Sequence, residues 1–259
     1  MDGVPPIPQQ RNHPDAARSH SGTGIAPDAP APEPAPEQAP EPPGEAGAPD
    51  APGAPAPSDN RFAVLGPVRA WRGAEALPSG SPQQRALLAV LLLRDGRTAT
   101  APELIDAIWG EDPPQQALAT IRTYASRLRK VLEPGLLVSD AGGYAVRLRQ
   151  EALDLGIARS LAADAEKARA AGDRALARTL LARALEMWDG EPLAGVPGPH
   201  AETERTRLSE WRLQLLETRL DLDLEVGQHA EAVSELTALT AAHPLQERLR
   251  ELLMLALYR

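Results

Sequence analysis

Two similar helix-start signals lie close together in the middle of the chain, and they constrain the fold more than any other feature. Ser81-Pro82-Gln83-Gln84 and Thr100-Ala101-Pro102-Glu103 each place a hydroxyl residue before a turn that contains proline. The hydroxyl can cap free backbone N–H groups, the side chain three positions later can return a hydrogen bond, and proline suits the first helical turn. The sequence therefore predicts a helix from Ser81 to a stop at Gly96 and a second helix from Thr100 to a stop at Gly110. Their expected buried residues are Ala86, Leu87, Val90, Leu91 and Leu93 in the first, and Leu104, Ile105, Ile108 and Trp109 in the second.

The segments around these two helices predict short strands and a third helix. RFAVLGPVRAWRG, from Arg61 to Gly73, has short apolar runs broken by glycine and proline, which is typical of two or three antiparallel strands. A third helix is expected over 115–132. LLVSDAGGYAVRL (136–148) is expected to form a hairpin, with glycines in its turn where φ must be positive. This order of elements is typical of a winged helix-turn-helix, although helices followed by a hairpin also occur in folds that bind no DNA.

The third predicted helix has one apolar side and one side without acidic residues. At about 100° per residue, the apolar stripe consists of Leu118, Ile121, Ala125, Leu128 and Leu132. The opposite side carries Gln116, Ala119, Thr123, Ser126, Arg127 and Lys130, with Arg122 and Arg129 at its edges. This composition suits a helix that enters the major groove of DNA, because Arg and Lys reach guanine edges or phosphates and Gln pairs with adenine.

Position along the helix predicts the kind of contact. Residues near the N-terminus of a recognition helix usually read bases, and later ones meet phosphates. We therefore expect base contacts from Gln116, Thr120 and Thr123, a phosphate contact from Lys130, and either kind from Arg127. Arg122 flanks this surface, and the hairpin is expected to place Tyr144 or Arg147 near the DNA backbone. A solvated basic helix face is the alternative interpretation; the position of the helix between a short capped helix and a Gly-Gly hairpin favours DNA binding.

Charge is distributed unevenly along the chain, whose net charge is −9. Residues 1–58 form a Pro/Ala/Glu-rich stretch with two basic and eight acidic residues, and they contain too few large apolar residues to offset the entropy of ordering. We interpret them as a disordered tail, a solvated leader rather than a docking segment. Residues 61–149 hold twelve basic and eight acidic residues, so a basic segment lies within an acidic chain. The absence of cysteine excludes disulfides and thiolate metal sites.

The C-terminal part of the chain is expected to be almost entirely helical. The candidate helices are 154–171, 174–188, 201–226, 229–243 and 246–258, and glycine turns at Gly172-Asp173 and Gly227-Gln228 are typical of tetratricopeptide-like helix pairs. Such stacks usually serve interactions, and a bundle that only completes the fold is the alternative. Trp188 and Trp211 are expected in the core. The predicted fold class is mainly α: a tail at 1–58, a winged-helix domain at 59–150 and a helical domain at 151–259.

These motifs resemble a known family. PQQRALLAVLLLRDGRTATAPELIDAIWGEDPPQQALATIRTYASRLRKVLEP, followed by GGYAVRL and then by LARALEMWDGEPLAG, is similar to the Streptomyces antibiotic regulatory proteins. These combine an OmpR-type winged helix with a bacterial transcriptional activator domain, and the resemblance covers everything after the tail. The family usually continues with another helix beyond LLMLALYR, so we expect the N-terminal part of a larger global regulator with an ATPase and repeats. Small members lack those regions, so a nearly complete chain is the alternative.

The resemblance also implies partners and a function. It implies a transcription activator that binds direct repeats in double-stranded DNA as a homodimer, recruits RNA polymerase including its sigma factor, and controls antibiotic production. In OmpR-type domains the loop between the second and third helices contacts polymerase, which here points to Glu111, Asp112 and Gln115. The residues alone are equally consistent with a rigid loop that has no partner. The implied location is the cytoplasm, with association to the nucleoid.

The sequence favours neither an enzyme nor a membrane protein. No Gly-rich phosphate loop or nucleophile elbow occurs, and His200, His229 and His243 lack the spacing of metal ligands. We therefore expect no catalytic residue, cofactor or metal. No apolar run is long enough to span a bilayer. A protein–protein adaptor that uses the winged helix and the helical repeats as a scaffold is the alternative function, and the acid-free face of residues 115–132 favours DNA binding over it.

Overall fold

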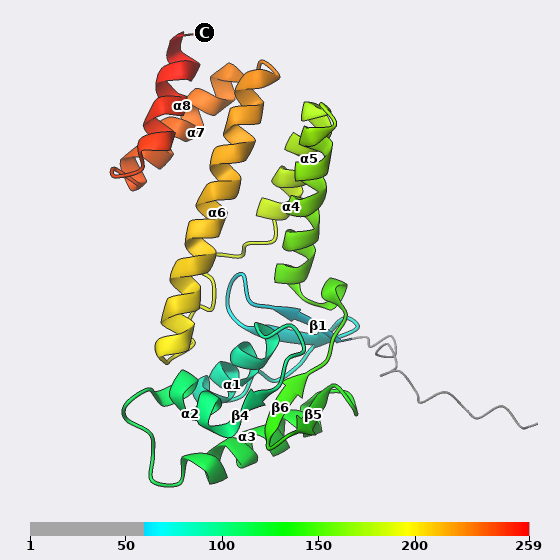
Figure 1. Ribbon diagram of the computed structural model, residues 1–259. Helices are drawn as coiled ribbons and strands as arrows, with labels where there is room; N and C mark the ends of the chain where they lie inside the picture. Colours follow the sequence, from blue (N-terminus) through cyan, green and yellow to red (C-terminus); the bar gives the residue numbers. More distant parts are fainter. Residues whose placement is uncertain (1–59, 259) are drawn as a thin grey trace, which may run out of the picture. The chain divides into compact units, whose positions relative to one another are not determined.

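The computed structural model describes residues 60–258, so the disordered tail predicted for residues 1–58 lies outside the described residues. The described part is mainly helical and contains two small antiparallel sheets (Figure 1). This agrees with the predicted fold class. The elements of the first half are β1 (Asn60–Ala63), β2 (Arg69–Arg72), β3 (Glu75–Ala76), α1 (Pro82–Leu92), β4 (Ala99–Thr100), α2 (Ala101–Trp109), α3 (Ala117–Val131), β5 (Leu137–Asp140) and β6 (Gly143–Val146). Those of the second half are η1 (Gln150–Ala152), α4 (Asp154–Ala170), α5 (Arg174–Leu185), α6 (Pro199–Glu225), α7 (His229–Ala242) and α8 (Glu247–Tyr258).

The first sheet has the order β1-β2-β3, and the second has the order β4-β6-β5. In the first sheet Phe62 pairs with Ala70, and both side chains are buried, as expected for alternating short strands. The two or three strands predicted between Arg61 and Gly73 are thus confirmed in part, because β3 lies just beyond that segment.

Both predicted helix starts are confirmed. Ser81 and Gln84 form a complete capping box at the start of α1, and Thr100 and Glu103 form one at the start of α2. Hydrogen bonds from Arg94 and Thr100 hold the pKa of Glu103 down to about 2, so its carboxylate stays charged at the positive end of α2.

The end of α1 and its burial differ from the prediction. The helix ends at Leu92 rather than at Gly96, and a turn follows in which Asp95 (φ 52°) and Gly96 (φ 79°) both adopt the left-handed conformation. The helix is also buried nearly all round, since Leu88, Ala89 and Leu92 are buried together with the predicted side. It contacts α2, α3, α6 and β6, which leaves it no solvent-facing stripe.

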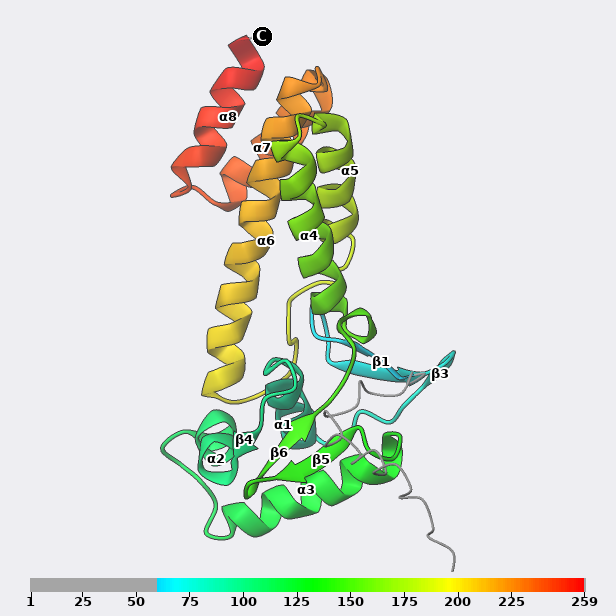
Figure 2. The ribbon, with the colours of Figure 1, turned by 45° about the vertical axis from the view of Figure 1, so that its right-hand side comes forward.

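The helices of the second half follow the predicted ranges closely. The main difference is α5, which ends at Leu185, so Trp188 lies in the connection that follows. Trp188 is buried and its ring centroid is 5.2 Å from that of Trp211, which is partly buried, so both belong to the core as predicted. α4 and α5 lie side by side and are joined by a tight turn in which Asp173 caps the backbone N–H of Leu176 (Figures 1 and 2).

Two hydrophobic cores meet on α6. Ala201, Leu208, Leu215 and Leu222 recur every seven residues and join the first core, which also includes residues of the winged helix, α4 and α5. The second core contains Leu213, Leu220 and Leu224 of α6 with residues of α7 and α8. Residues two positions apart differ by about 200° around a helix, so the two stripes lie on opposite sides of α6. The predicted boundary at residue 150 stays a prediction, because the first core includes residues on both sides of it.

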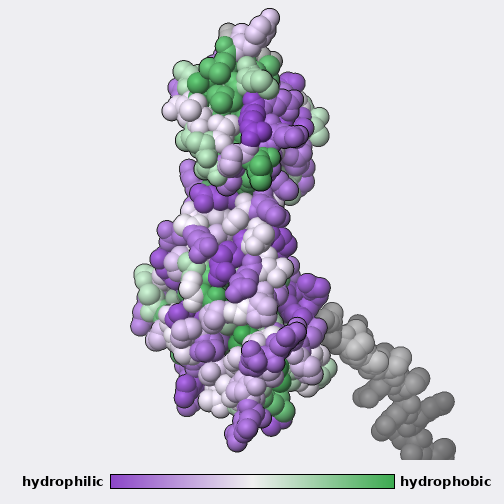
Figure 3. Space-filling model, turned by 90° about the vertical axis from the view of Figure 1, so that its left-hand side faces the viewer, coloured by the Kyte–Doolittle hydropathy of each residue, from purple (hydrophilic) through white to green (hydrophobic). Residues whose placement is uncertain are grey.

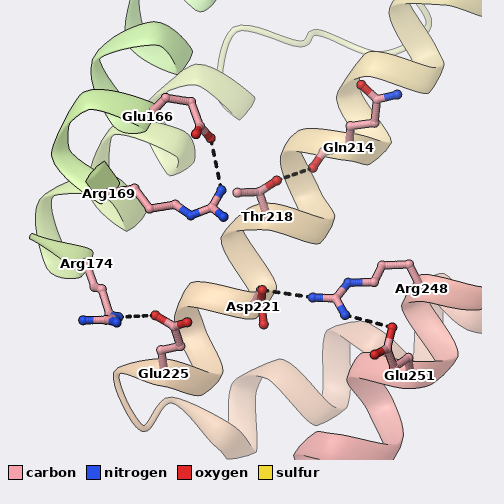
Figure 4. A network of polar contacts seen from close by, with 9 residues as sticks. All are labelled: Glu166, Arg169, Arg174, Gln214, Thr218, Asp221, Glu225, Arg248 and Glu251. Atoms are coloured by element: carbon pink, nitrogen blue, oxygen red, sulfur yellow. Dashed lines mark hydrogen bonds and ion pairs between the residues drawn. The ribbon is translucent and has the colours of Figure 1, made fainter. Parts of the chain in front are cut away.

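Ion pairs reinforce the packing around the C-terminal half of α6 (Figure 4). Arg174 of α5 pairs with Glu225, and Arg248 of α8 binds both Asp221 of α6 (3.0 Å) and Glu251 (2.8 Å). On the surface over α7 and α8 apolar side chains are visible (Figure 3), and Met254 and Leu257 of α8 are exposed.

A carboxylate joins the two halves of the described chain. Asp154, the first residue of α4, accepts hydrogen bonds from the backbone N–H groups of Val64 (2.9 Å) and Leu65 (2.9 Å), which follow β1. The segment after β1 is also held from the other side, because Leu193 N–H donates to the carbonyl of Val64 and Asp189 N–H donates to that of Leu65. Burial raises the pKa of Asp154 to about 6, although the backbone donors act in the opposite direction.

We predict that Asp154→Asn changes how stability depends on pH. The raised folded-state pKa means that the folded chain binds this proton more tightly than the unfolded chain, whose carboxyl has an ordinary value of 3.8. The stabilisation that depends on protonation of Asp154 is therefore full below pH 4 and lost as pH rises through about 6. The free energy of unfolding of the wild type, measured relative to Asp154→Asn, should fall by up to about 3 kcal/mol between pH 4 and 7.

Urea unfolding at a series of pH values measures this difference. Asp164→Asn, a substitution at a partly exposed position of the same helix, controls for placing an amide in α4. A difference that grows with pH, or stays constant, would contradict the prediction.

Candidate nucleic-acid interface

The buried side of α3 fixes which side chains face outward. Ile121, Ala125, Leu128 and Leu132 are buried as predicted. The prediction for Leu118 was wrong: this residue is 41% exposed, and Ala117 is buried in its place. At about 100° per residue, Ala117 lies about 40° from Ile121 on the side of Leu128, whereas Leu118 lies about 60° from Ile121 on the other side, beyond Ala125.

The outward side of α3 presents most of the predicted contact residues. Gln116, Arg122, Thr123, Arg127 and Lys130 are all exposed, and the helix contains no acidic residue. Thr120 is half-buried at the side of this surface, and its hydroxyl donates to the carbonyl of Gln116 (3.0 Å). The Thr123 hydroxyl likewise donates to the carbonyl of Ala119 (2.9 Å), so each hydroxyl oxygen keeps only its acceptor capacity.

Three cations on this surface have no partner in the described part of the chain. Among residues 60–258, the side chains of Arg122, Arg127 and Lys130 make no hydrogen bond and no ion pair, whereas most other arginines of the described part are paired with carboxylates or carbonyls. Charges left unpaired at a small-residue surface are available for an anionic partner. We call the exposed set Gln116, Ala119, Arg122, Thr123, Ser126, Arg127 and Lys130 the basic face.

The hairpin of β5 and β6 is attached to α3 by an arginine that the sequence analysis placed only at an edge. Arg129 donates to the carbonyl of Leu137 (3.2 Å) and to the hydroxyl of Ser139 (2.5 Å), and its guanidinium lies 5.5 Å from the ring centroid of Tyr144. Tyr144 is therefore half-buried against α3, while Arg147 is exposed on the same hairpin. The sequence signal for this role of Arg129 is its position in the last turn of α3, directly before the hairpin.

The two glycines of the hairpin turn have different roles. Ala141 (φ 46°) and Gly142 (φ 78°) occupy the two central positions between Asp140 and Gly143, which pair with each other. Gly143 does not have positive φ, so the expectation that it supplies this conformation was wrong. It is needed because β4 passes close by: a Cβ atom at Gly143 would lie 2.1 Å from the carbonyl oxygen of Ala99.

The loop between α2 and α3 is exposed throughout. Gly110 (φ 59°) caps α2, and residues 111–116, which include the predicted polymerase-contact residues Glu111, Asp112 and Gln115, are all exposed. Two turn hydrogen bonds shape the loop, from Asp112 N–H to the Trp109 carbonyl (3.3 Å) and from Ala117 N–H to the Pro114 carbonyl (2.9 Å). The loop leads directly into the basic face.

No group of three or more His, Asp or Glu side chains within residues 60–258 could hold a metal ion. No helix in that range is both long enough and apolar enough to cross a membrane.

We predict that Gly143→Ala destabilises the hairpin more than Gly142→Ala does. The first substitution forces a methyl group against the backbone of β4 and should cost about 3 kcal/mol. The second adds only left-handed strain, about 1 kcal/mol, because no atom lies within 4 Å of its Cβ position. Urea unfolding of both variants measures the difference, and equal losses would show that the approach of β4 is not the constraint.

Comparisons with known proteins agree with this architecture. Residues 76–144 match the family described as "Transcriptional regulatory protein, C terminal", and residues 153–259 match the "Bacterial transcriptional activator domain". The solved structure of Mycobacterium tuberculosis EmbR, in complex with a low affinity phosphopeptide, superposes with a TM-score of 0.74. It is 31% identical, and the match covers 78% of this chain and 55% of that one.

Curated relatives match most of this chain. The regulatory protein AfsR of Streptomyces griseus is 75% identical over 80% of this chain, but the chain spans only 22% of the length of that relative. The regulatory protein DnrI of Streptomyces peucetius is 33% identical, with 76% of each chain covered. The chain therefore belongs to the Streptomyces antibiotic regulatory protein family of transcriptional regulators, with an OmpR-type winged helix followed by a bacterial transcriptional activator domain.

Proposed function

We propose that this chain is a transcription activator that binds double-stranded DNA sequence-specifically by placing α3 in the major groove. The observation that carries the proposal is the basic face, which combines three unpaired cations with small side chains and contains no carboxylate. A helix of this kind fits the width of the major groove, and its cations can replace the counterions of the phosphates.

The geometry of the basic face supports separate residues for base contacts and for phosphate contacts. Gln116 and Thr123, near the start of α3, are exposed and suited to base edges, with Thr120 at the side of the helix as a weaker candidate. Lys130 and Arg122 are suited to phosphates, and Arg127 can reach either. On the hairpin, exposed Arg147 is better placed for a phosphate than Tyr144, which packs against Arg129.

The remaining parts of the proposal concern partners. The exposed acidic loop residues Glu111 and Asp112, with Gln115, would contact RNA polymerase, including its sigma factor. Two copies of the chain would bind direct repeats as a homodimer, in the cytoplasm and at the nucleoid, and activate genes of secondary metabolism. The names of the relatives support this role, since they are regulatory proteins of Streptomyces.

Selection of bound sequences from random duplex DNA by the full chain tests the proposal. We expect enrichment of two direct repeats about one helical turn apart, which is the spacing of half-sites for a dimer of this kind. If no sequence is enriched and no salt-sensitive binding occurs, the DNA-binding proposal fails and the protein–protein adaptor takes its place.

We predict that Lys130→Ala weakens binding to the selected site and to random DNA by the same factor. A phosphate contact carries no sequence information, and its loss should reduce the slope of log K against log salt by about one. Lys167→Ala is the matched control, because Lys167 is the only other lysine of the chain and pairs with Asp164 on α4. Titrations at several salt concentrations give both slopes; a sequence-dependent loss would assign Lys130 to a base instead.

We predict the opposite behaviour for Thr123→Ala. If Thr123 touches a base, its loss should cost about 1–3 kcal/mol on the selected site and relax the preference at one position. Thr179→Ala of α5 is the matched control, because Thr179 is also exposed and makes the same 2.9 Å hydrogen bond to the carbonyl four residues earlier. Equal losses on selected and random DNA would refute the base contact.

A further inference from the structure

The C-terminal end of α2 meets the N-terminal end of α6, as two views of the fold show (Figures 1 and 2). Gly198, the residue before α6, adopts φ 104°. A Cβ atom there would lie 2.6 Å from the carbonyl oxygen of Ile108 and 2.9 Å from that of Ala107, both in the last turn of α2. The backbone of the activator domain therefore touches the last turn of α2, and only glycine permits this approach.

Pro199, the first residue of α6, lies close to Gly110, the first residue after α2. Pro199, at the start of α6, places its Cγ atom 3.3 Å from the position of a Cβ atom on Gly110. Gly110 is also the residue from which the exposed loop of residues 111–116 departs. The contact is electrostatically favourable, because the negative end of one helix faces the positive end of another.

Within the loop itself, little holds its position. Its six residues are exposed, and of the two turn hydrogen bonds that shape it, the one on the α2 side ends on the Trp109 carbonyl, directly beside the contact with α6. The loop therefore leaves α2 at the point where Gly198 and Pro199 pack against the end of that helix.

We propose that the first turn of α6 positions the loop of residues 111–116, so that Gly198 and Pro199 of the activator domain are positioning residues for transcription activation. The effect on activation rests on the proposed function, which assigns this loop to RNA polymerase; the effect on the loop does not. The activator domain then contributes to activation through the shape it gives to a surface of the winged-helix domain.

A matched pair of glycine substitutions tests this inference. Gly198→Ala adds a methyl group against α2, whereas Gly195→Ala also places alanine at a positive φ (71°) but meets no atom within 4 Å. The chain has no cysteine, so Gln115→Cys carries a single spin label that reports the mobility of the loop. We expect the spectrum of the label to change with Gly198→Ala and to stay as in the parent with Gly195→Ala.

Transcription in vitro with the unlabelled full chain gives the second readout. Gly198→Ala should lower activation about threefold or more, while DNA affinity stays within about twofold of the wild type. Pro199→Ala, which removes the contact with Gly110 without adding atoms, should change the spectrum in the same sense, and it decides the question if Gly198→Ala does not fold. An unchanged spectrum in the folded variants overturns the inference. A changed spectrum with full activation overturns its effect on transcription and supports the positioning of the loop by α6.

The two proposals fail in distinguishable ways. Asp112→Ala tests the contact with polymerase directly, since Asp112 lies within the loop and is not among the atoms that surround Gly198. If Asp112→Ala and Glu111→Ala leave activation intact, the polymerase assignment of the loop is wrong. The spectrum of the label still decides whether α6 positions the loop.

Discussion

The hydrogen bonds that Asp154 accepts from Val64 and Leu65 are the constraint on which the relation of the two halves depends. A single carboxylate takes up the backbone donors of the segment after β1, and the carbonyls of the same segment are bound by the connection between α5 and α6. The N–H and C=O groups of Val64 and Leu65 are thereby all hydrogen-bonded to residues of the C-terminal half. Without these partners, buried N–H and C=O groups would be left unsatisfied, which is costly in any core.

The basic face depends on a second set of fixed contacts. Arg129 connects α3 to the hairpin, and Arg72 of β2 binds the carbonyl of Val131 at the end of α3. These two arginines are engaged within the protein, which leaves Arg122, Arg127 and Lys130 for an outside partner. The same residue type therefore serves two purposes on one helix, and only the structure separates them.

The sequence predicted those features whose signals are local. The starts of α1 and α2 were predictable because their capping hydrogen bonds, between Ser81 and Gln84 and between Thr100 and Glu103, form within one helical turn. The outward side of α3 was predictable from helical periodicity. Features that depend on distant segments were missed or mistaken. Leu118 is exposed because of how α3 packs on its neighbours, Gly143 is needed for the approach of β4, and α1 is buried on all sides because both halves of the chain surround it. The role of Asp154 could not be foreseen, since its partners lie about 90 residues earlier.

The opposite stripes of α6 have a mechanical consequence. A helix with one apolar stripe can roll slightly about its own axis to accommodate a change in its neighbours, but α6 has Leu215 and Leu222 on one side and Leu213 and Leu220 on the other. Any roll that improves one core withdraws side chains from the second. The rotation of this long helix about its own axis is therefore restricted from both sides along its C-terminal half. Its N-terminal end contacts α2.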